Sequence, residues 1–201
     1  MRRSSLNAVR ALSTLFGALW LNACSAPTRD TAIATATRIV TLPSSIAVLS
    51  QAEDAPSLPA QISFGSAHGR SALYLKFPTD FAAHGPPLKA FIALSPRQDA
   101  PVATTSTTVE AWRVSAAWRA EQLVAWSDKP ELAPPYARAQ LESSPPDEQR
   151  IDVTELLRFA AKNPDLDFGI ALLGRTGSGH GATFATGISG GTAPRLEVYV
   201  R

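Results

Sequence analysis

The chain has 201 residues, 45% of them hydrophobic, with 16 prolines and 12 glycines spread along it. This length suits one folded domain with short flanking segments, and the apolar content excludes a chain that is disordered throughout. The formal net charge of +2 falls to about −1 without Arg2, Arg3 and Arg10, because the 19 Lys and Arg become 16 against 17 Asp and Glu. A nearly neutral domain gives no electrostatic basis for binding nucleic acid.

The N-terminus has the form of an export signal. Residues 1–10 are basic, residues 11–20 carry no charge and are largely apolar, and Leu-Asn-Ala then leads to Cys24, the only cysteine. The apolar run is too short to span a bilayer, which takes about 20 apolar residues. The segment resembles a bacterial lipobox, which implies cleavage after Ala23 and acylation of Cys24. An ordinary signal peptide with an incidental cysteine is the alternative.

The residues around Cys24 also predict a location. Ser25 stands where an Asp tends to retain lipoproteins at the inner membrane of double-membrane bacteria, so we expect the outer membrane. The segment 24–36 is small and polar, which predicts a flexible tether. The sequence thus predicts a signal peptide over 1–23, a tether over 24–36 and one domain over 37–201, held in the bacterial cell envelope by lipid.

Short segments rich in β-branched and aromatic residues, separated by Pro and Gly turns, predict the strands of this domain. Residues 71–77 alternate, with Leu73, Leu75 and Phe77 on the core face and Tyr74 on the other. The predicted strands cover residues 37–42, 46–49, 61–64, 71–77, 88–94, 104–116, 167–173, 182–188 and 195–201.

One helix is predicted over residues 154–162. Asp152 precedes it with Glu155 three residues later, which is the spacing of a capping box, and an Asn-Pro pair ends it. Residues 130–146 contain several prolines and are predicted to be irregular. About nine short strands and one helix predict an all-β protein, a two-layer antiparallel β-sandwich of the jelly-roll kind.

Aromatic side chains are candidates for carbohydrate contact, because an exposed ring can stack on the apolar face of a sugar. We predict that Tyr74 and Arg113 lie on the non-core sides of their strands, which makes them candidates for a ligand face. Trp118 and Tyr136 are the other candidates for ligand contact, and Trp112 and Trp126 are further aromatic side chains that could form a platform. Trp118 and Trp126 bracket a segment between two strands, and the competing interpretation makes them core residues, one of them an anchor under a loop.

No motif in the sequence carries a catalytic site. The segment Gly187-Ile-Ser-Gly-Gly191 has the spacing of a nucleophile elbow, but no histidine follows Ser189 and no helix is predicted after it. The glycine-rich loop at 174–181 lacks the lysine of a phosphate-binding loop. The acids fall mostly in loops, which does not favour the paired carboxylates of a glycosidase. We therefore predict a protein that is not an enzyme.

No cofactor is predicted. The three histidines each neighbour a glycine in a turn and have no cysteine partner for zinc. These residues are His68, His84 and His180. A structural calcium ion is the alternative use of the acids near residues 163–167 or of Asp147 with Glu148, although neither group follows the EF-hand spacing.

Several segments taken together resemble the DNRLRE-type domain, a module similar to those appended to alginate lyases and other extracellular polysaccharide enzymes. The resemblance covers residues 34–201 and implies a jelly-roll fold and, in some members, carbohydrate binding. The segments that carry the resemblance are Leu73–Phe77, Trp118–Pro130, Ile151–Thr154, Phe168–Leu172, Phe184 and Ala193–Val200.

Two departures from this family pattern are expected to affect a ligand surface. Residues 52–59 lack the usual Asn-x-Gly loop, and Ala185-Thr-Gly-Ile188 replaces a frequent Ser-x-Glu. We expect a non-catalytic, lipid-anchored envelope protein whose β-sandwich binds a polysaccharide or a cell-surface partner. The alternative is a structural or assembly lipoprotein with a protein partner and no carbohydrate ligand.

Overall fold

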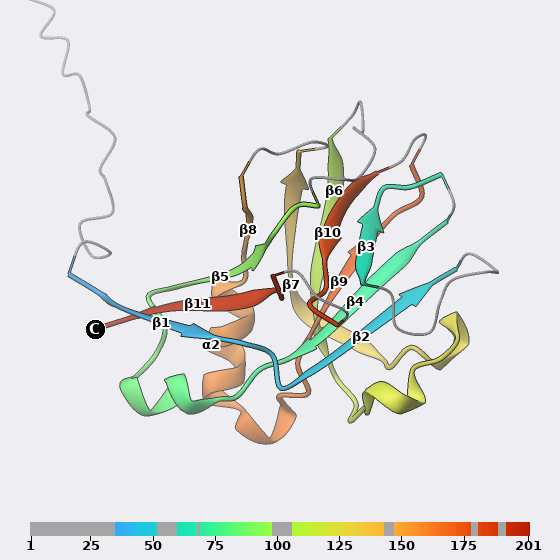
Figure 1. Ribbon diagram of the computed structural model, residues 1–201. Coiled ribbons are helices and arrows are strands. Elements are labelled where there is room, and N and C mark those ends of the chain that lie inside the picture. Colours follow the sequence, from blue (N-terminus) through green and yellow to red (C-terminus); the bar gives the residue numbers. More distant parts are fainter. Residues whose placement is uncertain are drawn as a thin grey trace, which may run out of the picture.

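The chain is an all-β sandwich, as the sequence predicts. Antiparallel sheets pack against each other in two layers (Figure 1), and Leu, Ile, Val and Phe side chains fill the space between them. The computed structural model describes residues 35–51, 60–67, 69–97, 106–142, 147–177, 181–188 and 192–201.

A five-stranded sheet forms one layer, in the order β2-β4-β9-β6-β7, and every pairing in it is antiparallel. Alternate residues of each strand face the other layer, because side chains along a strand point to opposite faces in turn. The strands are β2 (Ser45–Ser50), β4 (Ser71–Lys76), β6 (Thr107–Val114), β7 (Leu132–Leu141) and β9 (Ile170–Gly174).

The second layer contains a four-stranded sheet in the order β1-β11-β5-β8 and a two-stranded sheet of β10 and β3. The chain beyond β5 joins the two sheets, because Arg97 N–H donates to the carbonyl of Thr183 at 3.0 Å. Successive strands cross repeatedly between the layers, as in jelly rolls. The strands are β1 (Thr37–Thr41), β3 (Gln61–Phe64), β5 (Lys89–Leu94), β8 (Gln149–Asp152), β10 (Ala182–Ala185) and β11 (Arg195–Val200).

The predicted helix is confirmed as α2 (Thr154–Lys162), which contacts strands of both layers and lies at one end of the sandwich (Figure 1). Asp152 caps its start, since its Oδ1 accepts the backbone N–H of Thr154 at 2.9 Å. Glu155 does not complete a capping box and instead binds Arg158. Within the described residues, no helix is long and apolar enough to cross a membrane.

Within the described ranges, four short 3₁₀ helices occupy loops. The connection from β6 to β7 contains two of them, a third lies between α2 and β9, and the fourth lies between β4 and β5. Asp128 stabilises the connection from β6 to β7 by accepting the backbone N–H of Ala125 at 2.7 Å. They are η1 (Asp80–His84), η2 (Ala120–Gln122), η3 (Trp126–Asp128) and η4 (Pro164–Leu166).

The prediction that residues 130–146 are irregular is wrong, because ten of them form β7. Proline is tolerated there since β7 is an edge strand that, among the described strands, pairs only with β6. Pro134 and Pro135 also lie in the register shift, where Tyr136 pairs with Trp112 while Ala133 pairs with Arg113. Their missing N–H groups therefore cost no ladder hydrogen bond.

The predicted strand at 167–173 begins later than expected, at Ile170. Gly169 precedes it with a φ of +100°, a left-handed conformation that glycine adopts without strain. A side chain at this position would meet the backbone of Leu75. The turn at Gly169 breaks the alternation, so Phe168 does not share the core face of Ile170 and Leu172 and packs instead on the outer side of the sheet.

A second hydrophobic cluster covers part of the outer face of the five-stranded sheet. Residues 115–131 run from β6 to β7 and bring Trp118 and Leu123 onto side chains of β2, β4 and β9 that point away from the sandwich core. We call this the outer cluster. Its buried members are Ala47, Leu49, Ala72, Tyr74, Val114, Trp118, Leu123 and Ala171.

Candidate ligand-binding site

Tyr74 does not belong to a ligand face, and that prediction is wrong. Its side chain points away from the sandwich core as expected, but residues 115–131 cover it and leave it fully buried. Its ring lies edge-on to Trp118, with 5.9 Å between centroids. Burial raises the pKa of Tyr74 to about 12, and its hydroxyl has no hydrogen-bond partner in the described part of the chain.

Trp118 is the anchor of this covering segment, which confirms the core interpretation and overturns the ligand prediction for this residue. Its side chain is 9% exposed, and its indole Nε1 donates to the carbonyl of Phe168 at 2.6 Å. A buried indole needs such a partner. Trp126 is half-buried at the border of the outer cluster, with the Lys129 ammonium 5.5 Å from its ring centroid.

Arg113 packs against neighbouring strands and the helix and does not form part of an open ligand face. In β6 the core face is that of Val109 and Ala111, and Arg113 shares it, contrary to the prediction. Its guanidinium stacks 4.5 Å from the ring centroid of Phe159 in α2. It also donates to the backbone carbonyl of Pro134 at 3.2 Å, so it ties β6, β7 and α2 together at the end of the sandwich.

Tyr136 is the one sequence candidate that the structure leaves open to solvent, with 45% of it exposed. It stacks on Trp112, its partner across the β6–β7 pair, with 4.3 Å between ring centroids and 13° between ring planes. The Arg138 guanidinium lies 5.5 Å from the Tyr136 ring. These residues form a half-exposed aromatic stack beyond the edge of the outer cluster.

Glu110 holds the aromatic stack and two cations together. Its carboxylate accepts hydrogen bonds from Trp112 Nε1 at 3.2 Å, from Arg138 Nε at 3.1 Å and from Arg175 Nη2 at 3.1 Å. Burial alone would raise the pKa of Glu110, but the Trp112 hydrogen bond and the two arginines outweigh it and hold the pKa below its ordinary value. Glu110 therefore stays ionised and fixes the directions of its three donors.

An open groove of about 580 Å³ adjoins this stack, and Glu110 is part of its lining. The groove offers apolar surface, hydrogen-bond donors and an excess of positive charge, which together suit a polar ligand with apolar faces. Its lining includes Trp126, Leu132, Leu173, Arg70, Lys129 and Arg175.

Among the described residues, no group of three or more His, Cys, Asp or Glu side chains is placed to hold a metal ion. Asp167 binds the backbone N–H of Gly169 at 3.1 Å, and burial raises its pKa. Glu148 pairs with Arg195. These contacts account for two of the acids considered as calcium ligands. Cys24, His68, His180 and Ser189 lie outside the described residues.

The sequence predicts neither the groove nor the contacts of Glu110 and Arg138 with the stack, although Trp112 is among its aromatic candidates. The pattern was present, since Glu110-x-Trp112 and Tyr136-x-Arg138 each place two side chains on one face of a strand. This pattern does not predict the stack, because the prolines of residues 130–146 indicate an irregular segment and no local pattern places Tyr136 across from Trp112.

The fold, the stack of Trp112 and Tyr136 and the adjoining groove define the class of protein, which is a β-sandwich with an aromatic and cationic surface. A scan against protein-family models matches no family, and a search of the curated proteins finds no relative. The resemblance to DNRLRE-type domains therefore stays a prediction.

Proposed function

We propose that this chain is a non-catalytic, lipid-anchored protein of the bacterial cell envelope, whose sandwich binds a polysaccharide on the outer face of the five-stranded sheet. The half-exposed stack of Trp112 and Tyr136, beside an open groove with cationic and apolar lining, is the observation that carries this proposal. Aromatic faces pack on the C–H surface of sugar rings, while charged donors bind the hydroxyls.

Two sequence features support the cellular part of the proposal. The basic, apolar and Leu-Asn-Ala-Cys segments over 1–24 resemble a lipobox, and Ser25 favours the outer membrane. The resemblance to the DNRLRE-type domain supports a carbohydrate ligand. A protein partner in place of a polysaccharide is the second outcome that the experiments below distinguish.

We expect Tyr136→Ala to weaken binding to a polysaccharide by about tenfold, because one aromatic contact contributes about 0.5–1.5 kcal/mol beyond its area. The measurement is binding of the wild-type and variant chains to an array of neutral and acidic polysaccharides, followed by titration with the best one. Tyr199→Ala is the matched control, since Tyr199 lies in the other layer, edge-on to Phe91. It should bind like the wild type.

Loss of binding in both tyrosine variants would contradict a specific site at the stack. An array on which no polysaccharide is bound, together with a protein recovered by crosslinking in the envelope, would instead establish the structural or assembly alternative.

We expect Cys24→Ser to abolish incorporation of a fatty-acid analogue, because the thiol is the proposed acceptor and is the only one in the chain. The measurement is in-cell labelling followed by gel fluorescence. Ser25→Ala should label like the wild type. Labelling that persists in Cys24→Ser would overturn the lipid anchor and leave the binding proposal untouched.

A further inference from the structure

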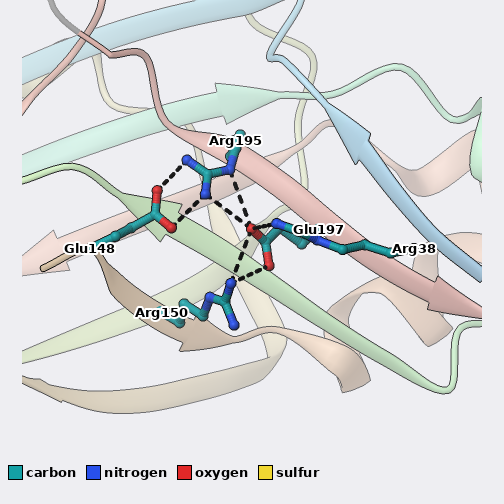
Figure 2. Close-up of polar contacts among 5 residues, drawn as sticks. All are labelled: Arg38, Glu148, Arg150, Arg195 and Glu197. Carbon is teal, nitrogen blue, oxygen red and sulfur yellow. Dashed lines mark hydrogen bonds and ion pairs between the residues drawn. The ribbon is translucent and has the colours of Figure 1, made fainter. Parts of the chain in front are cut away.

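Glu197 is an acidic residue buried on the outward side of the four-stranded sheet. The alternation of β11 places Leu196 and Val198 in the core and Glu197 on the opposite face, where a carboxylate is expected to meet water. Its side chain is instead fully buried. Figure 2 shows the reason, since guanidinium groups from three different strands converge on this one carboxylate.

The arginines come from β1, β8 and β11. Arg38 of β1 donates to Glu197 Oε1, and Arg195 Nε donates to the same oxygen at 3.2 Å. Arg150 of β8 donates from Nη2 to Oε1 at 3.5 Å, and the same nitrogen lies 3.2 Å from Oε2. Arg195 also holds Glu148, with 2.5 Å from Nη2 to Oε2. A single carboxylate thereby links the edge strand β1 to the middle of the sheet.

Strand β1 has little else to hold it. In the part of the chain that the structure describes, β1 pairs only with β11, and of its five residues only Ile39 packs on the core, while Val40 is 48% exposed. Among the described residues, Arg38 makes the one side-chain hydrogen bond from β1 to another strand. Segments with few buried apolar contacts open at lower free energy than the core does.

We propose that β1 is a releasable strand between the tether and the sandwich, and that the Arg38–Glu197 ion pair keeps it closed. Thr37 pairs with Val200, and Arg38 is the second residue of the strand. A pull from the N-terminal side peels an antiparallel strand from its first pair onward, so the ion pair stands where opening starts. Release of residues 37–43 lengthens the tether by roughly 25 Å, at about 3.3–3.6 Å per residue.

The direction of the pull rests on the proposed lipid anchor. The low free energy of opening β1 rests only on the contacts of β1 with β11 and Glu197. The test therefore does not depend on whether Cys24 is acylated. Hydrogen–deuterium exchange with mass spectrometry is followed in the full chain, purified in detergent from the producing cells. The Arg38→Gln variant should exchange the amides of 37–41 roughly tenfold faster than the wild type, because a charge-assisted hydrogen bond is lost.

Arg150→Gln is the matched control, because Arg150 meets the same carboxylate from β8. It should leave the exchange of 37–41 within about twofold of the wild type. Unchanged exchange of residues 37–41 in Arg38→Gln would overturn the proposal. An equal increase of exchange in both variants would also overturn it, because it would show that the whole sheet opens. If Arg38→Gln fails to fold by circular dichroism, Arg38→Lys replaces it with the same expected ranking. Failure of Cys24 labelling would remove the anchor without affecting this result.

Discussion

Replacing Trp118 by alanine is expected to lower the free energy of unfolding by about 3–5 kcal/mol, the range for truncating a large buried aromatic side chain. The indole is the anchor that holds residues 115–131 on the outer face of the five-stranded sheet. Its loss leaves a cavity against the Tyr74 ring, which lies 5.9 Å away between centroids. It also removes the donor to the Phe168 carbonyl, at 2.6 Å. Urea denaturation followed by circular dichroism measures the change.

Trp112→Ala is the control, because it deletes the same side chain from a half-exposed position on the same sheet. Its expected cost is about 1–2 kcal/mol, since less surface is buried and water can reach the site. Equal losses for the two variants would contradict the anchoring role of Trp118. A urea slope that differs between the variants would show that one of them exposes a different amount of surface on unfolding or no longer unfolds in two states.

Glu197→Ala is expected to lower the free energy of unfolding by about 3 kcal/mol. Removing one partner of a buried ion pair costs about 3–5 kcal/mol, because the remaining charge is left without compensation. Here the lower end applies, because the arginine side chains are 24% to 47% exposed and can be hydrated. The measurement is again urea denaturation, with the three arginines unchanged.

The control is Glu155→Ala, since Glu155 forms an ion pair with Arg158 at the surface of α2. An exposed pair of this kind contributes about 0–1 kcal/mol. A Glu197→Ala variant with the same free energy of unfolding as Glu155→Ala would contradict the prediction that the buried carboxylate stabilises the fold by compensating the charge of the three arginines.

Most strands could be predicted from the sequence, because each carries its own periodicity. Residues 71–76 and 195–200 alternate apolar and polar side chains, and the helix at 154–162 is bounded by Asp152 and by an Asn-Pro pair. Strand β7 could not be predicted, since its prolines are tolerated only because it lies at an edge. The position of a strand in its sheet is a non-local property.

The site was predicted less well than the fold. Of four candidate ligand residues, only Tyr136 is open to solvent, while Tyr74 and Trp118 lie in the outer cluster and Arg113 is stacked on Phe159. The alternation of apolar and polar residues predicts on which side of a strand a residue lies, but it does not predict whether a distant segment covers that side. For the same reason the burial of Glu197 could not be predicted, because it depends on arginines that lie 47 and 159 residues away in the sequence.

Local patterns alone predict the antiparallel sandwich, the helix at 154–162, and export with lipid attachment, because alternation, capping and the order of basic and apolar residues act over a few neighbours. Tertiary structure alone decided which outward faces stay open. Residues 115–131 close one part of the five-stranded sheet, and the pairing of β6 with β7 creates the stack of Trp112 and Tyr136 beside it. Both arise from contacts between segments whose meeting no local pattern encodes.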